Sequence, residues 1–196
     1  MMTRTRTEST GSAIIRPEFK RAINTANQIL QELGNPEAPI CPYFIANKYG
    51  WKIRHEQLMG PDGLTAKDIR NGKTKFVIFV ASDINQLYSE GTLKRRQRHT
   101  IAHEIGHILL HSEYDWFDLE PEIDQKLEVE AHWFAAQILM PDYVFKSIRD
   151  LDPETLSDKC DVNYTSAKKR IEKIDDKIAN RLIQDASTFF TRGPAG

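Results

Sequence analysis

The sequence predicts an α+β domain, in which helices flank a small β-sheet. Two segments favour strands: residues 51–54 (Trp-Lys-Ile-Arg) alternate apolar and polar side chains, and Lys75–Ala81 includes the apolar run Phe-Val-Ile-Phe-Val-Ala. Most of the remaining chain has apolar residues at helical spacing. With 196 residues, the chain is long enough for one domain with a substantial core.

The first part of the chain is predicted to contain a polar lead-in and two helices. We expect residues 1–16 to be disordered, because Met1–Ser12 is polar and lacks the apolar stretch of a signal peptide. Pro17 opens an amphipathic helix, and Gly34 stands where its C-terminal cap belongs. A second short helix is expected over Pro42–Lys48 and is ended by glycine at position 50.

The middle of the chain is predicted to complete the sheet and to form two longer helices. Met59–Lys73 is rich in Gly, Asp and Asn, which indicates turns around a weak strand. Asp83–Leu93 is expected to be a loop. Helices are expected over Lys94–His111 and Asp124–Met140, with an acidic loop between them, and Pro141 stops the second helix.

The last part of the chain is predicted to be helical. Short helices are expected over Tyr143–Arg149, Pro153–Lys159 and Thr165–Ser187. We therefore divide the chain into a main domain over residues 17–144, a helical segment over residues 145–190 that packs on it, and a frayed tail over residues 191–196.

The composition argues against several classes of protein. The formal net charge of −1 gives no global electrostatic case for nucleic-acid binding. With only Cys41 and Cys160, the chain has no disulfide framework and no Cys-x-x-Cys zinc site, and a reducing compartment fits. The apolar run over residues 76–81 is far too short to span a bilayer. We therefore expect a cytoplasmic protein that is neither secreted nor embedded in a membrane.

A run of five residues that begins at His103, His-Glu-Ile-Gly-His, matches the pattern His-Glu-x-x-His on a predicted helix. Residues four apart differ by only about 40° around a helix, so His103 and His107 can reach one ion. Glu104 can then reach a water on that ion and act as its general base. The alternative is a solvated stripe, because His99 and His111 continue the same spacing. We interpret His99 as a surface or cleft-edge residue and His111 as a support for the ligands.

The rest of this helix fits a metal site at the edge of a cleft. Its apolar face is expected to anchor in the core and comprises Ile101, Ala102, Ile105, Ile108 and Leu109. His103 and His107 project from roughly the opposite side, toward the cleft. Gly106 removes bulk near the pair and leaves room for a strand or a substrate chain to approach.

A catalytic zinc usually takes three protein ligands and keeps one position for water. The pattern that adds a third histidine fails, because it needs Gly and His where this chain has Leu110 and Glu113. A glutamate on the following helix is the next candidate, and helical geometry favours Glu128 over Glu130 by a narrow margin. His132, one turn after Glu128, could support a metal-binding histidine or bind metal itself. Replacing Glu128 by Ala should release zinc, and replacing Glu130 should largely keep it.

Two blocks of the sequence resemble the signature motifs of the ImmA/IrrE metallopeptidases. The first is Thr100–His111 (TIAHEIGHILLH) and the second is Glu128–Pro141 (EVEAHWFAAQILMP). The order of the blocks and their separation also match. The resemblance covers most of residues 17–174, and the two blocks are its specific part. It implies a zincin-like minimal metallopeptidase domain with a C-terminal helical segment.

By this resemblance, the site is gluzincin-like, with Glu104 as the catalytic glutamate and His103, His107 and Glu128 as ligands of Zn²⁺. Manganese or iron could also occupy such a site. The family usually has Asn or Asp where this chain has His132, which alters the hydrogen bonding around the ligands. The donor that stabilises the oxyanion is not specified; the candidates are Tyr88, Tyr114, Arg98 and His111.

Members of this family are typically intracellular peptidases, and several cleave a helix-turn-helix repressor encoded beside them. The resemblance therefore implies a zinc-dependent endopeptidase that relieves repression by cutting such a protein. Direct nucleic-acid binding is not expected, because the basic run Lys94–Arg98 is more simply a solvated helix start. The alternative is a toxin–antitoxin or phage regulatory protein that keeps the scaffold and sequesters its partner without cleavage.

Overall fold

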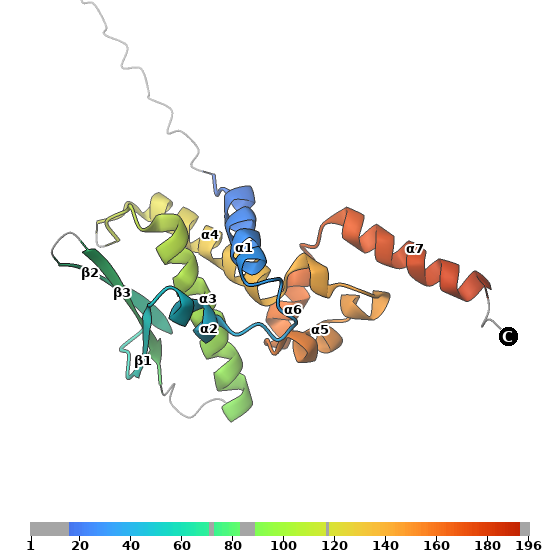
Figure 1. Cartoon of the computed structure of the whole chain (residues 1–196), viewed down its shortest axis with the longest axis horizontal. Helices are drawn as coiled ribbons and strands as arrows, with labels where there is room; N and C mark the ends of the chain where they lie inside the picture. Colours follow the sequence, from blue (N-terminus) through green and yellow to red (C-terminus); the bar gives the residue numbers. More distant parts are fainter. Residues whose placement is uncertain (1–15, 71–72, 83–88, 117, 193–196) are drawn as a thin grey trace, which may run out of the picture.

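The computed structural model describes residues 16–70, 73–82, 89–116 and 118–192. In this part of the chain, helices flank a small sheet, as predicted (Figure 1). The strands are β1 (Lys52–Glu56), β2 (Gly63–Arg70) and β3 (Lys73–Ala81). The α-helices are α1 (Phe19–Glu32), α2 (Pro42–Lys48), α3 (Glu90–His111), α4 (Pro121–Leu139), α5 (Pro153–Cys160), α6 (Tyr164–Ile171) and α7 (Asp176–Arg192). Two short 3-10 helices are η1 (Asp142–Val144) and η2 (Ile148–Leu151). Residues 1–15 of the predicted lead-in and residues 193–196 of the predicted tail lie outside the described part.

The sheet is mixed, with β3 in its centre. β1 runs parallel to β3, with Ile53 opposite Ile78, and β2 runs antiparallel to β3, with Thr65 opposite the same Ile78. The prediction of turns around a weak strand over Met59–Lys73 was wrong in extent, because every residue of β2 pairs with β3. This pairing stabilises a strand whose own sequence is largely polar. β2 forms the edge of the described sheet and contacts α3.

Helix α3 begins four residues before the predicted start at Lys94. The side chain of Ser89 caps it by accepting a hydrogen bond from the backbone N–H of Thr92 at 3.4 Å. Within the first turns, Lys94 Nζ lies 2.5 Å from a carboxylate oxygen of Glu90. Residues 90–93 are therefore helical rather than part of the predicted loop, and residues 83–88 of that loop lie outside the described residues.

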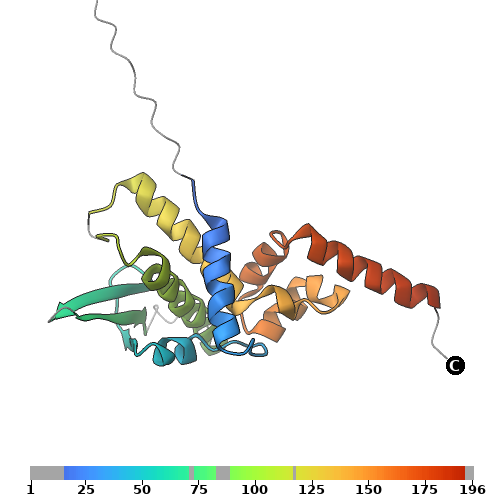
Figure 2. The same ribbon diagram turned by 45° about the horizontal axis from the view of Figure 1, so that its top comes forward.

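The core is built around the contact of α3 with α4. A methyl group added at Gly106 would lie 3.1 Å from Phe134 Cδ1 and 3.2 Å from Ala131 Cα. The absence of a side chain at Gly106 therefore allows α4 to pack closely against α3, rather than a strand or substrate chain as expected from the sequence. On its other side, α4 contacts α1, which lies across it (Figure 2). Ala22 and Ala26 of α1 are fully buried.

The C-terminal helices pack against the same core. Leu156, Cys160 and Ala167 belong to the hydrophobic cluster that contains the buried residues of α3 and α4. Cys160 is buried, and burial raises the pKa of its thiol to about 11. The guanidinium of Arg170 ties α6 to the end of α4 by donating to the carbonyl of Met140 at 2.9 Å.

Two of the predicted C-terminal helices differ in the structure. Thr165–Ser187 was predicted as one helix but forms parts of α6 and α7, and Asp175 Oδ1 accepts a hydrogen bond from the N–H of Lys177 at 2.8 Å where α7 begins. Tyr143–Arg149 was predicted as an α-helix but contains parts of η1 and η2. α7 extends away from the rest of the molecule (Figure 1).

Candidate metal centre

The four histidines on successive turns of α3 do not form a solvated face, because His103 and His111 are buried and His99 and His107 are partly buried. His111 is fully buried, and His103 and Glu104 are 9% and 7% exposed. The predicted division of this helix into a core face and a cleft face was too simple, because α4 and the sheet cover it on more than one side. Desolvated imidazoles require partners, and those partners define the site.

Three potential ligand atoms converge from α3 and α4. His103 Nε2 lies 3.0 Å from His107 Nε2. The two carboxylate oxygens of Glu128 lie 3.2 Å from His103 Nε2 and 3.1 Å from His107 Nε2. Ligands at about 2.0–2.2 Å from a tetrahedral zinc stand roughly 3.3 Å apart. The three side chains therefore have the spacing that such an ion needs.

The hydrogen bonds from His107 through His111 to Glu130 indicate which nitrogen of His107 carries a lone pair that can bind a metal. Glu130 Oε2 lies 3.0 Å from His111 Nε2, and His111 Nδ1 lies 3.2 Å from His107 Nδ1. A carboxylate can only accept, so the proton of neutral His111 is on Nε2, and its Nδ1 accepts from His107 Nδ1–H. The lone pair of His107 Nε2 is therefore directed at His103 and Glu128.

The charge states of the buried pair agree with this assignment. Burial is the largest influence on the pKa of His111 and lowers it, which keeps the imidazole neutral. Burial alone would raise the pKa of Glu130, but hydrogen bonds from the N–H of Glu18 and from His111 bring the net shift below its usual value. Ionised Glu130 thus acts on His107 through His111, the arrangement in which a carboxylate orients a metal-binding histidine.

The Glu128 carboxylate is held in its charged form by the two imidazoles. Hydrogen bonding to His103 and His107, which requires a proton on Nε2 of the ring, lowers the pKa of Glu128 far below its usual range, against the opposing effect of burial. Two imidazole lone pairs and a carboxylate directed at one another need a proton or a cation between them. The donor set fits a divalent metal, and the buried His103 Nδ1 has no hydrogen-bond partner among the described residues.

His132 also lies beside this cluster. Its ring centroid is 4.4 Å from that of His103. One ligand atom each of His103, Glu128 and His132 lies within 4.8 Å of the other two, a second set of three that could hold a metal. His99 lies behind, with its ring centroid 5.7 Å from that of His132. Burial, followed by the effect of His103, lowers the pKa of both His99 and His132 to about 4.

Glu104 faces the edge strand β2. Thr65 Oγ1 donates a hydrogen bond to Glu104 Oε2 at 2.8 Å. A methyl group added at Gly63 would lie 2.3 Å from Thr100 Cγ2 and 3.3 Å from Glu104 Oε1, so β2 approaches α3 closely here. A pocket of about 290 Å³ opens at this point. Its lining includes Glu104, His107 and Glu128.

The structure separates the candidates for the oxyanion donor. Arg98 donates to the carbonyls of Ile40 and Cys160, which commits its guanidinium to the fold. His111 is committed to Glu130. Tyr114 lies near the site, with its ring centroid 6.4 Å from that of His111. Tyr88 lies outside the described residues.

Other members of the basic run at the start of α3 are paired with acidic residues. Arg95 Nε lies 3.0 Å from Asp161, and Arg96 pairs with Asp62. These contacts join α3 to the segment after α5 and to the turn before β2. The run therefore stabilises the helix start and its neighbours.

Sequence reasoning missed the pairing of Glu130 with His111. Helical geometry favoured Glu128 over Glu130 as the inward-facing acid by a narrow margin, yet Glu130 is 1% exposed. The four-residue spacing of the histidines could have indicated this pairing. His111 lies one turn beyond the motif, is buried on the same helix, and therefore needs a hydrogen-bond acceptor.

A long helix between a small sheet and a second helix, with two histidines and a carboxylate that converge between the helices, is compatible with a metallopeptidase domain. Residues 86–172 match the family model Peptidase_M78, described as the IrrE N-terminal-like domain. This match supports membership of the ImmA/IrrE family, the family that the two motif blocks resemble. No curated protein matches the sequence. Among the described residues, the structure contains no helix with the length and apolarity needed to cross a membrane.

Proposed function

We propose that this protein is a zinc-dependent endopeptidase of the cytoplasm. The observation that carries the proposal is the convergence of His103, His107 and Glu128 within 3.2 Å of one another, beside Glu104. In this proposal these three residues hold the metal, and His111 and Glu130 orient His107. Bound zinc would supply Lewis acidity to the scissile carbonyl and to the attacking water.

Glu104 acts in this proposal as the general base and acid. Its carboxylate removes a proton from the attacking water and delivers it to the leaving amine nitrogen. The hydrogen bond from Thr65 fixes one carboxylate oxygen, so the other remains available to the water. The edge of β2 offers backbone groups beside Glu104, to which an extended peptide can add as a further strand. The substrate would thus be held with its main chain across the pocket.

We propose a helix-turn-helix repressor as the physiological substrate, and this choice rests on the family resemblance. Replacing Glu104 by Gln should keep zinc bound and reduce cleavage of the co-encoded repressor by at least about a hundredfold, the contribution typical of general acid–base catalysis. Metal content and the rate of cleavage, with and without a chelator, measure the two effects. Replacing exposed Glu122 by Gln provides a matched control. Full activity of the Glu104 variant would remove the proposed role.

His132 favours a second candidate function. Because it lies with His103 and Glu128 in a set that could hold a metal, it could fill the position that a catalytic zinc keeps for water. The protein would then be a regulatory module that binds its partner without cutting it. Binding of the repressor without cleavage in zinc-replete buffer would favour this candidate, and restoration of cleavage by His132→Asn would assign the block to that side chain.

A further inference from the structure

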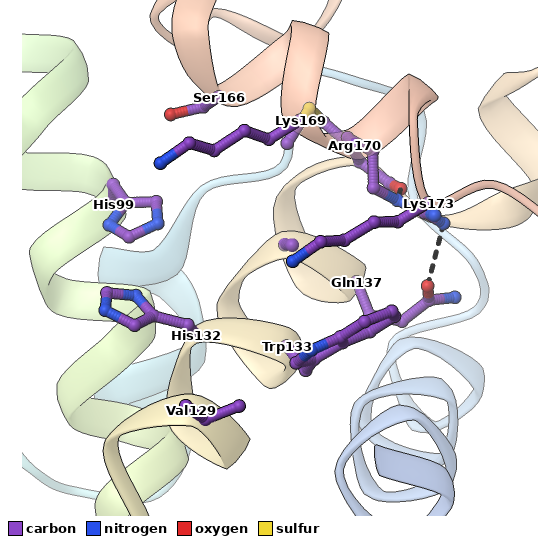
Figure 3. A pocket seen from close by; sticks show the side chains of 11 residues that line it. His99, Val129, His132, Trp133, Gln137, Ser166, Lys169, Arg170 and Lys173 are labelled. Atoms are coloured by element: carbon purple, nitrogen blue, oxygen red, sulfur yellow. Dashed lines mark hydrogen bonds between the residues drawn. The ribbon is translucent and has the colours of Figure 1, made fainter. Parts of the chain in front are cut away.

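A second pocket lies beside His132, which is one of its lining residues. It has a volume of about 310 Å³ and is enclosed by α3, α4 and α6. Figure 3 shows the side chain of Lys169, from α6, extending toward His99, and that of Lys173, from the turn after α6, extending over Trp133. The pocket shares no lining residue with the one beside β2. The two pockets are therefore separate.

The lining of this second pocket is positively charged. Lys169, Arg170 and Lys173 contribute to it, and none of the described residues that line it is acidic. Arg170 is occupied, because it donates to the carbonyl of Met140 and to the side-chain oxygen of Gln137, each at 2.9 Å. The two lysines form no ion pair with any described residue. Two amines without a counter-charge thus face a concave space.

The wall opposite the amines is aromatic and apolar. Lys173 Nζ stands 5.0 Å from the centroid of the Trp133 ring. Val129, Ala136 and Met140 continue this wall. A side chain that enters could place its methylene groups on the ring and its charged end between the amines. Glutamate has this combination of a short apolar stem and an anionic end.

The pocket also lies close enough to the proposed metal centre to contact a bound peptide substrate. His132, which lines it, offers a ligand atom within 4.8 Å of those of His103 and Glu128. A peptide lying across the centre would therefore present a group close to the scissile bond to this pocket. We infer that the pocket is a specificity subsite that binds a carboxylate of the peptide substrate through Lys169 and Lys173. This inference rests on the proposed peptidase function.

Binding can be tested without hydrolysis by using the zinc-loaded Glu104→Gln full chain. The probes are the capped pentapeptides Ac-Ala-Ala-Glu-Ala-Ala-NH₂, its Gln and Lys counterparts, and uncapped penta-alanine with a free terminal carboxylate. We expect the Glu peptide to bind about three- to tenfold more tightly than the Gln peptide in calorimetric titrations at low salt. Tight binding of uncapped penta-alanine instead would assign the carboxylate to a substrate C-terminus.

Charge reversal identifies the residues responsible. Changing both Lys169 and Lys173 to Glu should reverse the preference, so that the Lys peptide binds more tightly than the Glu peptide. Lys168→Glu is the matched control, because Lys168 lies on α6, is exposed, and does not line the pocket. Equal binding of the Glu and Gln peptides, or an unchanged preference after charge reversal, would overturn the inference.

Cleavage of a peptide library by the wild-type protein separates this inference from the proposed function. Cleavage with an acidic preference that the double variant loses supports both. Cleavage without an acidic preference supports the proposed peptidase function and contradicts the proposed subsite. Lysine-dependent binding of carboxylate peptides, in a protein that cleaves nothing in the library, supports the pocket and counts against the peptidase.

Discussion

The carboxylate of Glu130 influences the proposed ligand His107, although it is not itself part of the proposed metal site. Glu130 accepts hydrogen bonds from His111 and, at 2.7 Å, from the backbone N–H of Glu18. Lys126 Nζ lies 3.6 Å from the same carboxylate. These contacts hold the Glu130 carboxylate in place in its charged form. Its hydrogen bond to His111 fixes the orientation of that ring, which in turn orients His107. Single residues outside the ligand set can therefore control metal affinity.

This chain of contacts changes an expectation drawn from the sequence. Replacing Glu130 by Ala should not leave metal binding largely unaffected, but should weaken zinc affinity about 10–100-fold, as expected when the support of a metal-binding histidine is lost. Glu128→Ala should abolish binding under the same conditions, because it removes a proposed ligand. Competition with a chromophoric chelator measures both variants, with exposed Glu122→Ala as the control. Wild-type affinity in the Glu130 variant would show that His111 does not transmit the constraint.

At the scale of secondary-structure elements, the proposed activity should depend on how closely β2 approaches α3, because Thr65 of β2 donates to Glu104. Gly63 has no side chain at the point of contact, and an added methyl group would overlap Thr100 Cγ2. Thr100 is β-branched and lies in a buried helix, so it has little freedom to move away. The strand must therefore shift, and Thr65 would move with it, away from Glu104.

We accordingly expect Gly63→Ala to reduce peptide cleavage while zinc binding is retained. Overpacking of this kind costs about 1–3 kcal/mol in the free energy of unfolding. Gly91→Ala is the matched control, because a methyl group there meets no atom within 4 Å. Cleavage rates, zinc content and urea unfolding of both variants provide the measurements. Unchanged cleavage by the Gly63 variant would mean that the position of β2 does not govern Glu104.

The elements differ in how far the sequence predicts them, and the reason is the range of the interactions that form them. Pro42–Lys48 was predicted with its observed bounds, because a proline and a glycine mark its ends locally. β2 was underestimated, because its stability comes from pairing with β3 rather than from its own residues. In the candidate site, the spacing of His103 and His107 is local. The burial of Glu130 depends on how α4 rotates against α1 and α3, which only the packed structure shows.

At the scale of the whole molecule, the C-terminal helices complete the core instead of forming an independent unit. Leu156 and Ala167 are fully buried in the cluster that holds α3 and α4. The division into residues 17–144 and 145–190 remains a proposal about the chain's organisation, and in it the second segment packs on the first. Such an interface predicts that the two segments unfold together.

Arg170 tests this coupling, because its buried guanidinium bridges the two segments. It donates to Met140 and Gln137 of the main segment and lies 2.5 Å from Asp142. Arg170→Ala would leave these acceptors without their donor, so we expect a loss of about 2–4 kcal/mol in the free energy of unfolding. Exposed Lys168→Ala serves as the control. Urea unfolding followed by both circular dichroism and tryptophan fluorescence should show one coincident transition, shifted as a whole. Two separate transitions, of which only one shifts, would mean that the helical segment folds independently of residues 17–144.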